Sequence, residues 1–288
     1  MPIDPEEALK AEPTLTEVGW TRRDVLLYHL SLGAGSGPDP ELAYTYERGL
    51  RVLPTFAAVA GQGISTGEQD RASMRMSGVD VELRRILHAG QELTVHRPLP
   101  ASGTATLSSR VTEVWDKGKA ALVAYEQSAT DEDDGPLWTE TMRLWIRGEG
   151  GFGGEPGPED HWSAPERSPD LVHDAPTSSR QALLYRLNGD LNPLHADPEV
   201  ARAAGFDRPI LHGLASYGIA AKTVVDRVLD GDASRLSGLS VRFAGVLRPG
   251  QTIRTEMWRT GEEVLLRATC PERDGAPVLT HARARIAP

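Results

Sequence analysis

The chain has 288 residues, 39% hydrophobic and 25% charged, which is the composition of a folded protein long enough for two domains. Its formal net charge of −10 argues against a nucleic-acid partner, because phosphate binding needs clustered Lys and Arg. The single cysteine, Cys270, excludes an internal disulfide, and no apolar run approaches the ~18 residues that a membrane helix needs.

The first half is predicted to contain a helix followed by strands. The helix begins near Pro54, in the segment PTFAAVAG. Val81 to Leu99 then indicates a strand, a turn marked by Gly90-Gln91 and a second strand. DKGK, at Asp116 to Lys119, predicts a further turn between strands.

The middle of the chain is predicted to be a linker, because Gly148 to Asp170 is rich in Gly and Pro and has no periodicity. A GxGxxG-like fragment begins at Gly148, but no strand–helix–strand context follows it, so we reject a dinucleotide site. We place the first domain at 1–150, the linker at 151–170 and the second domain at 171–288.

The second half repeats the pattern of the first. A thin helix, rich in Gly and Ala, is predicted from about Gly213 to Leu229. Leu239 to Trp258 follows as strand, turn and strand, with Gly250-Gln251 at the point that matches Gly90-Gln91. The final VLTHARARI alternates as a half-buried strand does. Two such halves in tandem predict an α+β fold in which each helix packs on an antiparallel sheet.

The densest polar signal lies just before the second helix. Turn-forming Gly-Asp and Asn-Pro pairs place Asp190 and His195 in one loop, which offers a carboxylate and the side chain that titrates near neutral pH. Asn192 could hold either a water molecule or the carboxylate. A metal centre is not expected, because a third ligand at metal-binding spacing is missing.

The loop by itself favours a structural role, since Asp190 could cap backbone N–H groups and His195 could be a half-buried histidine. Gly213 shifts the balance toward a site. Its N–H opens the thin helix, where donors are unpaired and the helix dipole favours negative charge, so it is a candidate oxyanion donor for a thioester carbonyl. His212, taken alone, is more often structural.

These motifs closely resemble the signature of the R-specific (type 2) enoyl-CoA hydratases of the MaoC-like dehydratase family. The signature residues are Tyr185-Arg186-Leu187, Gly189-Asp190, Asn192 to His195 and Pro209 to Gly213. The resemblance extends over nearly the whole chain, at Tyr28-His29-Leu30, Tyr46-Glu47, Leu53 to Phe56, Leu87-His88, Asp116-Lys117-Gly118, Gly150 to Gly154 and Arg242-Phe243-Ala244.

The resemblance implies two hot-dog domains, each a long central helix wrapped by an antiparallel sheet. The second domain would be catalytic, and the first, which has Pro54-Thr55 where the second has His212-Gly213, would make room for bulky acyl chains. The implied reaction is reversible hydration of trans-2-enoyl-CoA to (3R)-3-hydroxyacyl-CoA. Asp190 and His195 would share the proton transfers.

Further site residues are expected in supporting roles. Asn192 would fix the water, and the Gly213 N–H would face the developing oxyanion. Substrate contacts are expected from Tyr185, His212 and Phe243, from Glu47 by resemblance, and from Arg242 at the CoA phosphates. For Glu47 and Arg242, the alternative is that each is simply a solvated charge on the surface. Asn188 and Leu191 depart from the usual pattern, which leaves the acyl chain length open.

The remaining expectations concern partners and rival functions. We expect no cofactor beyond the CoA of the substrate, a homodimer as the family suggests, and a cytoplasmic location, because the acidic N-terminus lacks a signal-peptide core. The nearest rival is a dehydratase of acyl carrier protein or polyketide-type thioesters. A hot-dog thioesterase usually carries its acidic residue on the helix, and a non-catalytic acyl-CoA binding subunit fits poorly with an intact Asp190/His195 pair.

Overall fold

The computed structural model describes residues 2–60, 73–133, 135–159 and 162–287. Ten strands in these ranges form an antiparallel sheet in the order β1-β5-β6-β7-β4-β9-β12-β11-β10-β8, and β2 pairs with β3 in a small sheet of its own. The strands are β1 (Thr14–Trp20), β2 (Ser73–Met76), β3 (Val79–Glu82), β4 (Ile86–Val95), β5 (Gly103–Asp116), β6 (Ala120–Thr130), β7 (Pro136–Arg147), β8 (Leu171–Pro176), β9 (Leu236–Phe243), β10 (Thr252–Thr260), β11 (Glu263–Cys270) and β12 (Ala276–Ile286). The α-helices are α1 (Pro5–Lys10), α2 (Arg22–Ser31), α3 (Leu42–Thr45), α4 (Gln181–Tyr185), α5 (Pro198–Ala203) and α6 (Gly213–Val228).

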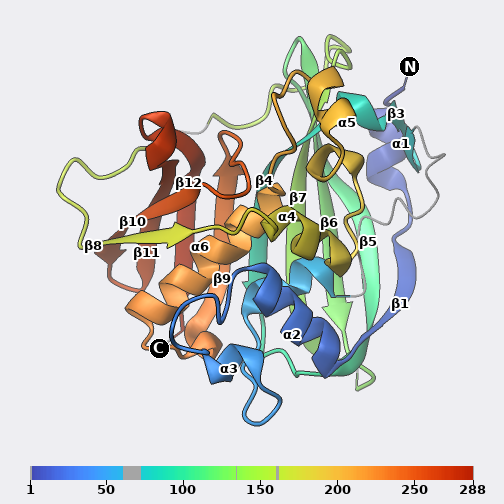
Figure 1. The fold of residues 1–288 in the computed structure, drawn as a ribbon. Helices are drawn as coiled ribbons and strands as arrows, with labels where there is room; N and C mark the ends of the chain where they lie inside the picture. Colours follow the sequence, from blue (N-terminus) through green and yellow to red (C-terminus); the bar gives the residue numbers. More distant parts are fainter. Residues whose placement is uncertain (1, 61–72, 134, 160–161, 288) are drawn as a thin grey trace.

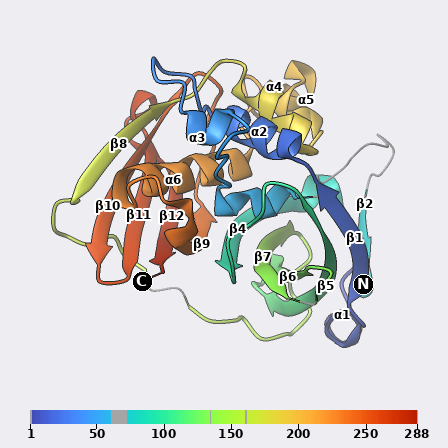
Figure 2. The same cartoon turned by 90° about the horizontal axis from the view of Figure 1, so that it is seen from below.

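The two halves of the chain occupy opposite halves of the large sheet. They meet where β4 pairs with β9, from Gly90 opposite Arg242 to Thr94 opposite Gly238. Seen from below, the strands of the first half curl on the right and those of the second half lie on the left (Figure 2). The predicted α+β class with antiparallel sheets is therefore confirmed. None of the helices among the described residues is long and apolar enough to cross a membrane.

The second half contains the predicted thin helix, α6, against the concave side of its strands (Figure 1). Eleven of its sixteen residues are buried, so it is enclosed on nearly all sides. Gly218 explains why it must be thin. A Cβ atom there would lie 2.7 Å from both the Tyr28 hydroxyl and Leu32 Cδ2, which belong to α2 and its end. The missing side chain at Gly218 thus lets an element of the first half pack directly on α6.

Two predictions for the first half are wrong in detail. The helix that begins at Pro54 is, in the described residues, a 3-10 helix of six residues, η1 (Pro54–Val59). The predicted segment ended at Gly61, which lies outside the described residues. Gly90-Gln91 lies inside β4 and not in a turn, whereas Gly250-Gln251 does precede β10. Because β4 corresponds to β9 in the sheet order and β5 to β10, the two Gly-Gln pairs are not equivalent.

The glycine-rich linker binds a carboxylate of its own chain. Asp116, at the end of β5, accepts hydrogen bonds of 2.8 Å from the N–H groups of Gly118, Gly151 and Gly153. Backbone N–H groups in such turns form a natural anion site. Two N–H groups of the fragment that resembles a nucleotide-binding loop, those of Gly151 and Gly153, are thus taken up by Asp116.

Candidate active site

The loop that carries Asp190 is held by its own turn chemistry. Gly189 adopts a φ of 120°, a conformation that side chains rarely allow, and this ends the 3-10 helix η3 (Arg186–Asn188) that follows α4. The Asp190 carboxylate accepts the Asn192 N–H at 3.1 Å, and Asn192 Oδ1 caps the 3-10 helix η4 (Pro193–His195) through the Leu194 N–H at 3.0 Å. The backbone N–H of Asn192, not its side chain, therefore holds the carboxylate. The side-chain nitrogen Nδ2 of Asn192 stays available to a water molecule.

His195 is fixed in one tautomer by the backbone. Its Nδ1 lies 2.9 Å from the Ile210 carbonyl oxygen, which can only accept, so Nδ1 carries the proton and Nε2 presents a lone pair. The side chain is 9% exposed. Burial lowers the pKa of His195 below its usual range, while the nearby Asp190 carboxylate opposes part of this change. At neutral pH, His195 is thus a neutral imidazole poised to accept a proton at Nε2.

His212, for which the sequence favoured a structural role, contacts both Asp190 and His195. Its ring stacks on that of His195, with centroids 3.7 Å apart, and its Nε2 donates to the Asp190 carbonyl oxygen at 3.3 Å. The same nitrogen lies 4.0 Å from the Asp190 carboxylate. Burial and the neighbouring His195 lower the pKa of His212 to about 2, so it stays neutral.

The expectation that a third metal ligand is missing is wrong. One ligand atom each from Asp190, His195 and His212 lies within 4.8 Å of the others, so a third ligand is present. The orientation of the rings is the better argument. Two imidazoles stacked 25° from parallel, with centroids 3.7 Å apart, hold their in-plane lone pairs in two separate planes, whereas an ion shared by both rings must lie close to both planes, about 2.1 Å from each nitrogen. The arrangement suits proton transfer better than metal binding.

Gly213 supplies the expected unpaired donor beside these groups. It is the first residue of α6, so its N–H has no partner within the helix, and it finds no acceptor among the described residues. Phe243 packs directly against it. A Cβ atom at position 213 would lie 3.1 Å from Phe243 Cε1, so any larger residue would push the ring away. The N–H group remains open to a ligand atom next to His212.

The structure places the other predicted residues at different depths. Tyr185 lies behind the site, with its ring 4.9 Å from that of His212 and its buried hydroxyl without a partner in the described chain. Arg242 is exposed and lies on the face of β9 opposite Phe243, because neighbouring strand residues alternate. Glu47 is exposed, just after α3. The structure does not bring Arg242 or Glu47 to the loop of Asp190.

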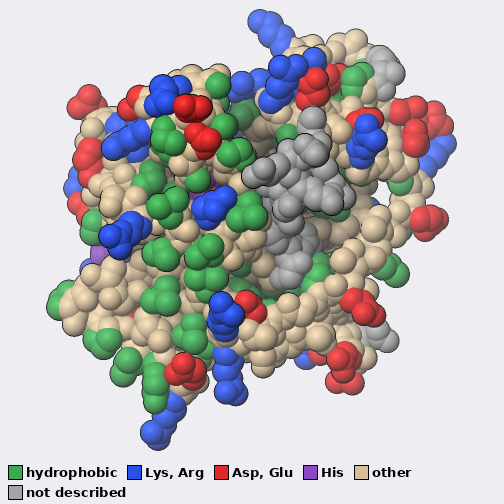
Figure 3. Space-filling model, turned by 45° about the vertical axis from the view of Figure 1, so that its right-hand side comes forward, with side chains coloured by type: hydrophobic (Ala, Val, Ile, Leu, Met, Phe, Trp, Pro, Cys, Tyr) green, Lys and Arg blue, Asp and Glu red, His purple; other side chains and the backbone are tan. Residues whose placement is uncertain are grey.

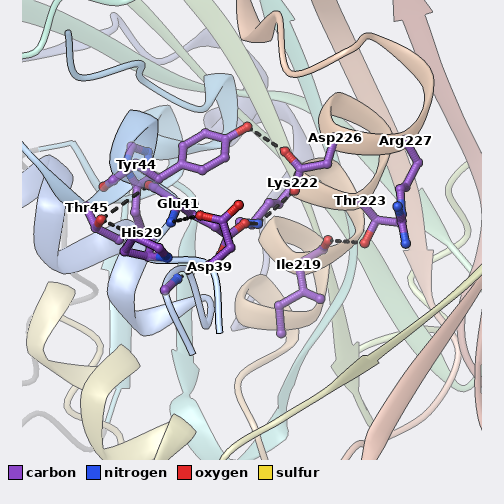
Figure 4. A network of polar contacts seen from close by, with 12 residues as sticks. His29, Asp39, Glu41, Tyr44, Thr45, Ile219, Lys222, Thr223, Asp226 and Arg227 are labelled. Carbon is purple, nitrogen blue, oxygen red and sulfur yellow. Dashed lines mark hydrogen bonds and ion pairs between the residues drawn. The ribbon is translucent and has the colours of Figure 1, made fainter. Parts of the chain in front are cut away.

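The segment before Glu47 is clamped onto α6 by a network that joins the two halves (Figure 4). Lys222 forms ion pairs with Glu41 and, at 2.7 Å, with Asp226. The Tyr44 hydroxyl donates to Asp226 at 2.8 Å, and the Tyr44 carbonyl accepts from His29 Nδ1 at 3.0 Å. This network fixes α2 and α3 over the helix whose first residue is the candidate oxyanion donor.

Sequence reasoning missed a buried polar chain in the first half. His88 Nε2 lies 3.0 Å from Gln91 Oε1, and Gln91 Nε2 donates to Glu140 at 3.0 Å. Glu140 is 4% exposed, and burial raises its pKa to about 8. The alternation in LWTETMRLW could have identified it, because Glu140 shares the inward register with Trp138 and Leu144.

Comparison with known proteins agrees with this architecture. The model of the MFE-2 hydratase 2 N-terminal domain matches residues 19–148, and that of the MaoC like domain matches residues 160–273. An enoyl-CoA hydratase of Mycobacterium tuberculosis is 48% identical over 97% of this chain and 98% of its own length. The chain belongs to the MaoC-like dehydratase family. A 3-hydroxyacyl-thioester dehydratase of the same organism is 40% identical over 90% of this chain and 89% of its own length.

Two solved structures share the fold of this chain. A MaoC-like dehydratase from Phytophthora capsici superimposes with a TM-score of 0.87 at 31% identity, and the match covers 98% of each chain. A Mycobacterium tuberculosis protein described as a double hot-dog fold matches with a TM-score of 0.56 at 14% identity, over 96% of each chain. The tandem hot-dog fold of this MaoC-like chain is thereby confirmed, although the first central helix is short in the described residues.

Proposed function

We propose that this chain hydrates trans-2-enoyl-CoA thioesters to (3R)-3-hydroxyacyl-CoA in fatty-acid or related acyl-CoA metabolism. The observation that carries the proposal is the grouping of Asp190 and His195 beside the open N–H of Gly213 at the start of α6. A carboxylate, a neutral imidazole and an oxyanion donor are the groups that addition of water to an enoyl thioester requires. The named hydratase relative supports the same substrate class.

The protonation states limit how the pair can act. Since His195 Nε2 presents a lone pair and the Asp190 carboxylate an acceptor oxygen, the proton delivered to C2 is one that the pair has first taken from the water. The C3–O and C2–H bonds form, the C2–C3 π bond and one O–H bond of water break, and the pair returns to its starting state. The Gly213 N–H stabilises the negative charge on the thioester oxygen, and the Asn192 amide orients the water. No cofactor beyond the CoA of the substrate takes part.

A dehydratase that acts on carrier-protein thioesters is the second candidate, because a 3-hydroxyacyl-thioester dehydratase is among the relatives. The same groups would act in the reverse direction. An acidic carrier protein needs a basic docking face, and on the face in Figure 3 blue and red side chains are interspersed. A thioesterase fits less well, because the first acidic residue of α6 is Asp226, which is bound to Tyr44 and Lys222.

Two finer features belong to the same proposal. A cytoplasmic location is expected, and so is a homodimer. Leu183 and Leu187, which are 52% and 57% exposed near α4, offer an apolar surface for self-association.

The test is crotonyl-CoA hydration by the wild type and by Asp190→Asn and His195→Ala, with the stereochemistry of the product determined. Each substitution is expected to lower kcat at least 1,000-fold, in line with about 10²–10⁴-fold for one general acid or base plus lost water orientation, without a loss of fold by circular dichroism. Wild-type rates in both variants, or an S-configured product, would refute the assignment. Release of free CoA would favour the thioesterase.

A further inference from the structure

The buried polar chain of the first half begins at a β-bulge that changes the direction of one side chain. In the pairing of β4 with β7, His88 faces Leu144 and Gly90 faces Arg143, so Ala89 is an extra residue. In a regular strand His88 and Gln91, which are three residues apart, would point to opposite faces, and the bulge turns both to the same face. Gly90 permits the bulge, because a Cβ atom there would lie 3.0 Å from the Val241 carbonyl oxygen.

The chain consists of neutral groups held in fixed orientations. Gln91 is 1% exposed and donates to Glu140 through its amide nitrogen, so its oxygen faces His88 Nε2 and that nitrogen carries the proton. Burial lowers the pKa of His88 to about 4 and raises that of Glu140 to about 8. The imidazole ring is thus anchored to the interior of the first half and carries no charge near pH 7.

The His88 ring also reaches the catalytic half. It contacts Phe243 edge to face, with ring centroids 4.7 Å apart and an interplanar angle of 63°. Phe243 in turn lies against Gly213, within the space that a Cβ atom would fill. Phe243 is therefore held between a ring anchored in the first half and the residue whose N–H is the proposed oxyanion donor.

We infer that His88 is a positioning residue, which acts through Phe243 to hold the Gly213 N–H in line with the thioester oxygen. Gln91 and Glu140 fix the ring in place. This role rests on the proposed function, and it makes the half without the acid–base pair contribute to the orientation of the reacting groups. Small misplacements of a preorganised donor are costly, because its contribution depends on geometry in the transition state.

The test is a double-variant cycle on crotonyl-CoA hydration with His88→Ala and Phe243→Leu. His88→Ala is expected to lower kcat about 10-fold with KM changed less than about twofold, since only transition-state binding is lost. The double variant is expected to be no slower than the slower single variant, because both changes break one contact path. His96→Ala, an exposed histidine just past β4, is the matched control and should keep the wild-type kcat.

Three results overturn the inference: a wild-type kcat for His88→Ala, a loss that appears only in KM, or losses that multiply in the double variant. If His88→Ala fails to fold by circular dichroism, His88→Leu fills the same space and carries the same cycle. A wild-type chain that does not hydrate crotonyl-CoA refutes the proposed function instead. An active wild type with an equally active His88→Ala refutes only the positioning role.

Discussion

Glu140 allows a quantitative prediction, because a buried carboxylic acid makes the stability of the protein depend on pH. Its pKa is raised to about 8 by burial, against 4.5 for a free Glu side chain, although the donor from Gln91 opposes the shift. Between these values the folded protein keeps the proton and the unfolded chain has lost it. The contribution of Glu140 is fully present below pH 4.5 and is lost as the pH rises through 8.

The size of the effect follows from the width of this window. Each pH unit lowers the free energy of unfolding by about 1.4 kcal/mol, and the whole interval by roughly 5 kcal/mol, because the slope flattens only close to either pKa. Glu140→Gln removes the titration and keeps an oxygen that accepts from Gln91. We therefore expect the stability of the variant relative to wild type to rise by about 3 kcal/mol from pH 5 to pH 8.

The assay is urea unfolding at pH 5, 6, 7 and 8, followed by tryptophan fluorescence, which the buried Trp138 two residues away makes sensitive to this region. Glu92→Gln, a neighbour in β4 whose side chain is 41% exposed, serves as the control and should show no such trend. Parallel pH curves for wild type and Glu140→Gln would refute the reasoning, since they would mean that Glu140 titrates alike in both states.

Two further predictions follow from the clamp and from the acid–base pair. Lys222→Met leaves the partly buried carboxylates of Glu41 and Asp226 without their shared cation. The free energy of unfolding, measured by urea titration, should therefore fall by about 2 kcal/mol. An unchanged unfolding midpoint would contradict this. Because burial lowers the pKa of His195, hydration should keep its full rate down to below pH 6.5 and decline only on further acidification. A decline of kcat/KM for crotonyl-CoA centred above pH 6.5 would show that another group limits the reaction.

The sequence by itself determined the local features of this protein. The turn at Asp190 and the thin helix from Gly213 depend on the conformational preferences of neighbouring residues, and both are present. The alternation predicted for the last strand holds only from Ala282 onward, because an irregularity at His281, with a φ of 52°, shifts the register. The local pattern was insufficient at Gly90, where the same residue types that form turns can also form a bulge within a strand. Only pairing with the adjacent strand decides between the two.

The tertiary structure alone decided how the site is assembled. His212 stands 17 residues after His195, and stacking of their rings required α6 to dock beside the loop. Likewise, no periodicity relates His88 to Glu140 or to Phe243, because these contacts cross between strands and between the two halves. Local preference fixes each element separately, whereas the packing of the sheet and α6 determines which side chains meet.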